Sequence, residues 1–303
     1  MESLAGLRER RAFECRLTPD RALESLDEAE GFLRDRGLLT RTADSALPSL
    51  YEACHEEEYQ PGGRGFATWP ATKWPWFGEL AGRGYLCVAV HRGKNLLVSG
   101  QTAALLDPIC RAETDRMRAE DPAWRRLLDH LATAGPSLID DLRLELGLGR
   151  QELKALRSPL ERCGAVIARS VAMTSASEAA AGAAADSEAH ARSTELSRWD
   201  QAYASVPASA PGNPPSPAVP APPAGPARTL SAPPRSRPVP AAPADPVAAL
   251  GDLLVAAVRA AVIAPEAELR RWFSWPWYWT GTLVDDLVRS GRLRRVDGHL
   301  AAG

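Results

Sequence analysis

The sequence predicts an α+β protein that is mostly α-helical, with helical segments that end in small β-hairpins. Two segments predict this fold, because residues 121–174 and 246–303 each place three helical patterns ahead of an alternating strand pattern. A third observation divides the chain: fifteen of its twenty-six prolines lie between Pro207 and Pro246. A segment of that composition buries too little apolar surface to offset its ordering entropy, so we expect a disordered linker there.

The first helix of residues 121–174 opens on a clear start signal. Asp121 is a favourable N-cap, and Pro122 suits the first helical position. Apolar residues then recur at helical spacing until a Gly-Pro pair ends the helix. The spacing next predicts a short second helix over residues 138–146.

A glycine turn over residues 147–149 joins the second helix to a third, which runs from Arg150 to about Cys163. Residues 165–173 then alternate as a strand does. This order of elements is that of a winged helix-turn-helix, in which the third helix enters the major groove of DNA. Its polar face carries the predicted DNA-binding residues Arg150, Gln151, Lys154 and Arg157, with Gln151 the candidate for a base or sugar contact.

The same order recurs in residues 246–303. Helical spacing covers residues 246–261, 266–273 and 280–290, and Asp297-Gly298 is a hairpin turn signal that predicts a wing. Asp285 and Asp286 on the third helix suit a DNA groove poorly, so a protein-binding scaffold is the alternative for this unit. Four cationic residues here are predicted to contact phosphates: Arg271, Arg292, Arg294 and Arg295.

The rest of the chain is less regular. Residues 27–37 predict a helix that ends at Gly37, residues 84–99 predict a hairpin, and residues 102–118 predict a helix that Pro108 kinks or divides. The expected domains are a tail (1–19), an N-terminal α+β region (20–120), a winged helix domain (121–174), a linker (175–245) with a short docking helix near 195–204, and a C-terminal winged helix domain (246–303).

An aromatic segment offers a further candidate site. Trp69, Trp74 and Trp76 surround Lys73, and such rings can stack on nucleic-acid bases. The alternative is that these rings fix a loop-rich region onto the folded body.

Composition limits the possible functions. The net charge of -2 excludes a uniformly basic coat, so any DNA affinity must come from local clusters. Arginine far outnumbers lysine, as in translations of GC-rich bacterial genomes. The five cysteines have no CxxC spacing, which predicts reduced thiols, no metal site and no cofactor. With no long apolar run, we expect a cytoplasmic protein without membrane contact.

A set of motifs in this order resembles a known family. The segments are PSLYEAC (Pro48–Cys54), TWPATKWPWFGEL (Thr68–Leu80), GPSLIDDLRLELGLGR (Gly135–Arg150), RWFSW (Arg271–Trp275) and LVDDLVRSGRLRRVDG (Leu283–Gly298). Together they are similar to the AlkZ-like winged-helix family, which includes a bacterial DNA glycosylase that unhooks interstrand crosslinks. The resemblance implies tandem winged helices that bind double-stranded DNA.

The family's catalytic signature is absent. Its glycosylases position a hydrolytic water with a Gln-x-Gln or Gln-x-Asp motif, and none of the four glutamines here has Gln or Asp two residues later. We therefore expect a catalytically silent DNA-binding protein related to repair. One alternative is a glycosylase that uses another water-positioning group, such as Glu52 or Glu79. The other is a scaffold that recruits proteins through its winged helices and proline-rich linker.

Overall fold

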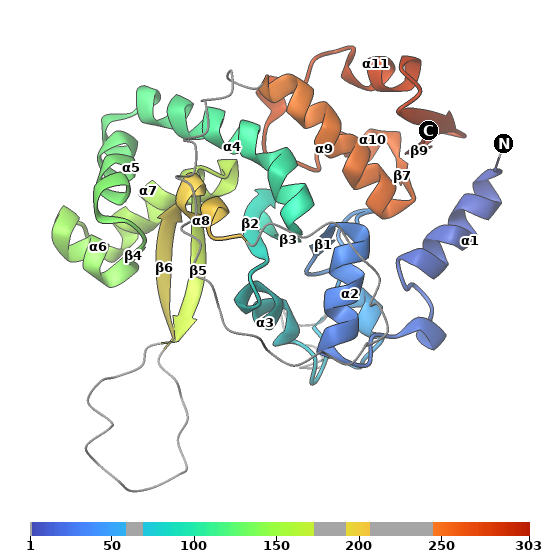
Figure 1. Ribbon diagram of the computed structural model, residues 1–303, viewed down its shortest axis with the longest axis horizontal. Helices are drawn as coiled ribbons and strands as arrows, with labels where there is room; N and C mark the ends of the chain where they lie inside the picture. The colour runs from blue at the N-terminus through green and yellow to red at the C-terminus, as the bar shows by residue number, and fades with distance from the viewer. Residues whose placement is uncertain (1, 59–68, 173–191, 207–244) are drawn as a thin grey trace, which may run out of the picture.

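The computed structural model describes residues 2–58, 69–172, 192–206 and 245–303. It is an α+β protein that is mostly α-helical, with three small antiparallel sheets, as the sequence predicted (Figure 1). No helix in these ranges is both long and apolar enough to cross a membrane. Most of the expected linker, residues 175–191 and 207–244, lies outside the described residues.

The first sheet belongs to a unit that the sequence did not reveal as a repeat. Its strands follow the order β1-β3-β2, so the first strand pairs with the last. The unit consists of α2 (Leu26–Arg36), β1 (Leu38–Thr40), a 3₁₀ turn (Glu52–Cys54), α3 (Trp76–Gly82), β2 (Leu86–His91) and β3 (Lys94–Val98).

The second unit has the same order of elements, and its strands follow the equivalent order β4-β6-β5. It consists of α5 (Pro122–Ala134), β4 (Ser137–Leu138), α6 (Ile139–Leu146), α7 (Arg150–Cys163), β5 (Val166–Ala172) and β6 (Arg192–Arg198), followed by α8 (Trp199–Ala204).

The third unit repeats the pattern once more, with strand order β7-β9-β8. It consists of α9 (Pro246–Ala261), β7 (Ile263–Pro265), α10 (Glu266–Leu269), a 3₁₀ turn (Pro276–Tyr278), α11 (Leu283–Arg289), β8 (Leu293–Val296) and β9 (His299–Ala302).

One long helix, α4 (Gly100–Glu120), lies between the units and packs against α5, α7, α8, α9 and β3 (Figure 1). The expected break at Pro108 does not occur, and the helix runs through this residue without interruption. A proline within a helix removes one backbone hydrogen bond, and tertiary packing compensates here because Leu106, Ile109 and Cys110 are fully buried.

The third unit, which we expected to stand apart, shares its hydrophobic core with the body. The backbone N–H of Ser274 donates to the carbonyl of Val90 at 3.0 Å. The buried indole Nε1 of Trp275 donates to the carbonyl of Cys163 at 3.0 Å, which joins the third unit to the end of α7. Residues far apart in sequence therefore form a single packed interior.

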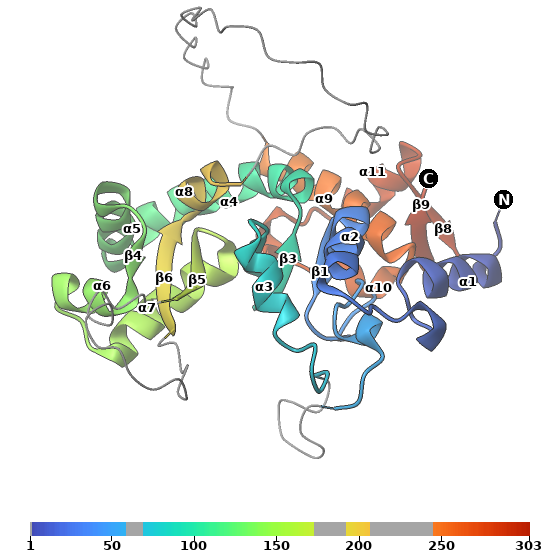
Figure 2. The ribbon, with the colours of Figure 1, turned by 60° about the horizontal axis from the view of Figure 1, so that its bottom comes forward.

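Two further boundaries differ from the sequence-based assignment. Residues 4–14, placed in the tail, form helix α1 (Leu4–Glu14), whose Leu7 is buried in a small cluster with Ile263 and Ala301 of the third unit. Both chain ends accordingly lie on the same side of the molecule (Figure 2). Residues 192–198, placed in the linker, form strand β6 in register with β5, and the docking helix begins only at Trp199.

Replacement of Trp275 by phenylalanine tests the shared core. The ring would still fill its site, but the buried carbonyl of Cys163 would lose its donor, so we expect Trp275→Phe to lower the free energy of unfolding by about 1–3 kcal/mol. Urea unfolding followed by circular dichroism measures this change. The control is Trp76→Phe, because the half-buried Trp76 indole donates to no described residue. Equal losses in both variants would contradict a shared core held by this bond.

His91 joins three segments at the boundary between the first and third units. Its Nδ1 lies 2.7 Å from the carbonyl of Trp272, and because a carbonyl only accepts, Nδ1 carries the proton. Its Nε2 lies 3.3 Å from Ser45 Oγ and 3.4 Å from a carboxylate oxygen of Asp44. Burial lowers the pKa of His91, against the opposing effect of Asp44.

A depressed histidine pKa makes stability depend on pH. As pH falls below the ordinary histidine value of about 6.5, the unfolded chain takes up a proton that the folded protein does not, so the free energy of unfolding should decrease. Urea unfolding of the wild type and of His91→Asn between pH 7.5 and 5 measures this effect. The wild type should lose more stability over that interval, and identical pH profiles would contradict the assignment.

Candidate nucleic-acid interface

The solvent-exposed face of α7 carries three of the four side chains that were predicted on this helix to contact DNA. Leu153 and Leu160 are buried against the body, which fixes the roll of the helix about its axis. The same roll exposes Arg150, Gln151 and Lys154 on the opposite side. Neither Arg150 nor Lys154 makes an ion pair with another described residue. The first two turns of α7 therefore present two free cations and one amide to solvent.

The turn before α7 also contributes to this surface. Gly147 ends α6 with φ of 62°, a left-handed conformation that glycine adopts at little cost, and so the chain turns sharply into α7. The backbone N–H of Gly149 then donates to a carboxylate oxygen of Glu152 at 2.6 Å. This hydrogen bond folds the only acidic side chain of the first two turns back onto the helix N-terminus.

Arg157, the fourth residue predicted on α7, is engaged within the helix. Its guanidinium lies 2.7 Å from the carboxylate of Glu161, and both side chains are largely buried. Burial raises the pKa of Glu161, while Arg157 acts in the opposite direction. Arg157 thus balances a nearby carboxylate, and we withdraw it from the set of predicted phosphate contacts.

Three of the four arginines of the third unit that the sequence predicted to contact phosphates are paired with carboxylates. Arg292 lies 2.6 Å from Asp252, and Arg294 lies 3.6 Å from Glu2. Arg295 bridges two carboxylates, those of Glu266 and Asp285. Of the four residues predicted here, Arg271 alone is exposed and makes no ion pair with a described residue.

Arg295 has two carboxylate partners, whereas Arg292 and Arg294 have one each. It lies 2.8 Å from Glu266 and 2.6 Å from Asp285, so it ties α10 to α11. Hydrogen bonds to these two carboxylates raise the pKa of Arg295. Asp285 and Asp286 are exposed on α11, so the helix equivalent to α7 presents acidic groups to solvent in this unit.

The tryptophans of the aromatic segment pack together on the first unit. Trp69 and Trp74 stack with ring centroids 6.3 Å apart, and both lie against the core that contains Phe77. The hydroxyl of Tyr51 donates to the carbonyl of Trp74 at 2.6 Å. Trp76 is half-buried with the ammonium of Lys73 5.6 Å from its ring centroid. These contacts favour the structural interpretation of the segment over base stacking.

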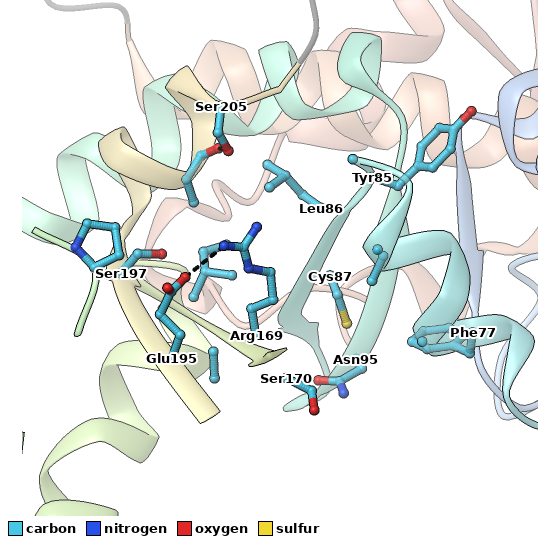
Figure 3. A pocket seen from close by; sticks show the side chains of 18 of the residues that line it. Phe77, Tyr85, Leu86, Cys87, Asn95, Arg169, Ser170, Glu195, Ser197 and Ser205 are labelled. Atoms are coloured by element: carbon cyan, nitrogen blue, oxygen red, sulfur yellow. Dashed lines mark hydrogen bonds and ion pairs between the residues drawn. The ribbon is translucent and has the colours of Figure 1, made fainter. Parts of the chain in front are cut away.

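A cavity that sequence reasoning missed lies between the first and second units (Figure 3). It has a volume of about 310 Å³ and is enclosed by α3 and β2 on one side and by β5, β6 and α8 on the other. Arg41 and Arg169 line it, and neither belongs to a motif with a recognisable spacing. Glu52 and Glu79, considered above as catalytic groups, are exposed and are not among its lining residues.

The metal-ligating and thiol side chains of the described ranges form no metal cluster and no disulfide. No three His, Cys, Asp or Glu side chains there come close enough together to hold a metal ion. The five cysteines are unpaired, and burial raises the pKa of Cys163 to about 12 and that of Cys15 to about 11, so these thiols are protonated at neutral pH.

Comparisons with known proteins add no relative. No family model, curated protein or solved structure matches the chain. The similarity to the AlkZ-like family therefore stays a prediction from the motifs.

The ion pairs of Arg295 should stabilise the third unit. We expect Arg295→Ala to lower the midpoint of thermal unfolding slightly, because Arg295 is bidentate to Glu266 and also binds Asp285, and an exposed ion pair contributes to stability mainly in such a network. Arg271→Ala removes the same charge from an exposed side chain without an ion partner, and its midpoint should stay that of the wild type. Differential scanning fluorimetry distinguishes the two. An equal midpoint for both variants would show that the bridge contributes nothing.

Proposed function

We propose that the chain is a DNA-binding protein of three tandem winged helices and that α7 of the second unit is its main DNA-reading element. The single observation that carries this proposal is the exposed, unpaired set of Arg150, Gln151 and Lys154 on the first turns of a helix that follows a short helix and a glycine turn.

The topology of the units supports the winged-helix part of the proposal. In each unit a helix, a strand, a helix or short turn and a further helix precede a hairpin, and the first strand pairs with the last. In each unit the first helix and the hairpin pack against the helix that precedes the hairpin. A helix supported in this way can insert into a major groove about 12 Å wide.

The charge distribution supports α7 over its equivalents. An arginine or lysine adds affinity for DNA because its contact with a phosphate releases counterions. The gain is largest for a side chain that does not first have to break an ion pair with a carboxylate. Arg150 and Lys154 meet that condition, whereas Arg292 and Arg295 are held by Asp252, Glu266 and Asp285. We therefore propose that the third unit serves mainly as a support for the other two.

Binding of fluorescently labelled duplex DNA over a range of salt concentrations tests the proposal. The double variant Arg150→Ala/Lys154→Ala should bind more weakly at every salt concentration. The slope of log affinity against log salt should also become shallower by about 2, because two phosphate contacts are lost. Fluorescence anisotropy gives both quantities in one titration.

The matched control removes the same charge from paired residues. Arg289→Ala/Arg292→Ala takes away two arginines held by Asp286 and Asp252, and exposed pairs of this kind contribute little to stability. Its affinity and salt slope should stay close to those of the wild type. If this control lost as much affinity as the α7 variant, binding would depend on overall charge and the assignment to α7 would be wrong.

A further inference from the structure

The cavity between the first and second units has the features of a site for a small organic anion. Its walls are mainly apolar, and Phe77, Leu86 and Ile167 are among the apolar side chains that line it. A cavity of about 150 Å³ accepts benzene, so a volume of about 310 Å³ has room for two fused rings. Pockets that bind small molecules combine such walls with a few polar groups that fix orientation.

Arg41 supplies a charge that the folded chain does not neutralise. Its guanidinium carbon lies 4.7 Å from the ring centroid of Phe77 and 5.3 Å from that of Trp69, so two rings hold it in place. Its Nε is buried and has no hydrogen-bond partner. No described carboxylate forms an ion pair with it. A carboxylate in the cavity that Arg41 lines would supply the counter-charge that the described residues do not.

The other polar groups of the cavity leave this positive charge in excess. Arg169 on β5 and Glu195 on β6 are opposite each other in the hairpin and form an ion pair of 2.9 Å, so their charges cancel (Figure 3). Burial raises the pKa of the Cys87 thiol to about 11, so it is uncharged at neutral pH. Asn95 adds a neutral amide at the edge of the same space.

Helix α3 leaves the space open. Gly78 and Gly82 line the cavity, and a Cβ built on either residue meets no atom within 4 Å. Both lie within α3, where glycine costs about 1 kcal/mol relative to alanine. Because both glycines line the cavity, a larger side chain at either position has room to extend beside it without a clash at Cβ.

We propose that this cavity binds a small aromatic carboxylate, whose carboxylate pairs with Arg41 and whose ring lies among Phe77, Leu86 and Ile167. The apolar walls favour an organic anion over the phosphate of a nucleic-acid backbone, which is polar on every side. This site is separate from the exposed face of α7, and it does not depend on DNA binding.

Isothermal titration calorimetry with 2-naphthoate, in the absence of DNA, tests the proposal on the full chain. We expect saturable binding to the wild type with one site per chain. The uncharged 2-naphthamide should bind at least tenfold more weakly, because it cannot form the charge-assisted pair with Arg41. Arg41→Gln should weaken 2-naphthoate binding by at least the same factor.

A cavity-filling variant separates loss of the site from loss of the fold. Gly78→Leu should weaken binding at least tenfold without lowering the midpoint of thermal unfolding. Gly31→Leu is the matched control, because its Cβ also meets no atom within 4 Å but Gly31 lies on α2 outside the cavity. It should bind 2-naphthoate like the wild type.

Four results would overturn the proposal: no saturable binding of 2-naphthoate, equal binding of 2-naphthamide, wild-type affinity in Gly78→Leu, or displacement of 2-naphthoate by an equal concentration of inorganic phosphate. The last result would assign the cavity to phosphate.

Discussion

Burial of apolar side chains along α4 is the interaction on which the whole arrangement depends. Each sheet has only three short strands, and a sheet of that size does not enclose a core alone. The units solve this by packing against α4 and against one another, so that Leu106 and Ile109 contribute to one continuous interior with residues of the second and third units. The position of α7, and hence of the side chains that it exposes, follows from this shared core.

The sequence predicted the helices of the second unit because their signals are local, whereas in the third unit the helix predicted over residues 266–273 spans only Glu266–Leu269. Asp121 caps α5, glycines separate the helices, and Leu153 and Leu160 repeat at helical spacing, as the structure confirms. The repeat in the first unit was missed because α3 spans only seven residues, contains glycine and has no capping side chain. Strand β6 was missed because its sequence is polar and its pairing with β5 bridges a long intervening segment.

The candidate site was harder to predict, because the role of an arginine depends on carboxylates that are distant in sequence. Arg294 lies beside Glu2, and Arg292 beside Asp252, and no local pattern indicates either contact. Arg150 and Lys154 on α7, in contrast, form no ion pair with a described residue. The cavity could not be predicted for a similar reason. Arg41 and Arg169 come from different units, and they line the same cavity because β2 packs against β5.

Hydrogen exchange measured by mass spectrometry, with and without duplex DNA, tests the central claim most directly. A helix that enters the groove should exchange its exposed amides more slowly in the complex, so residues 147–158 should gain protection while residues 283–296 should not. Protection confined to the third unit, or protection absent from α7 at saturating DNA, would contradict the account.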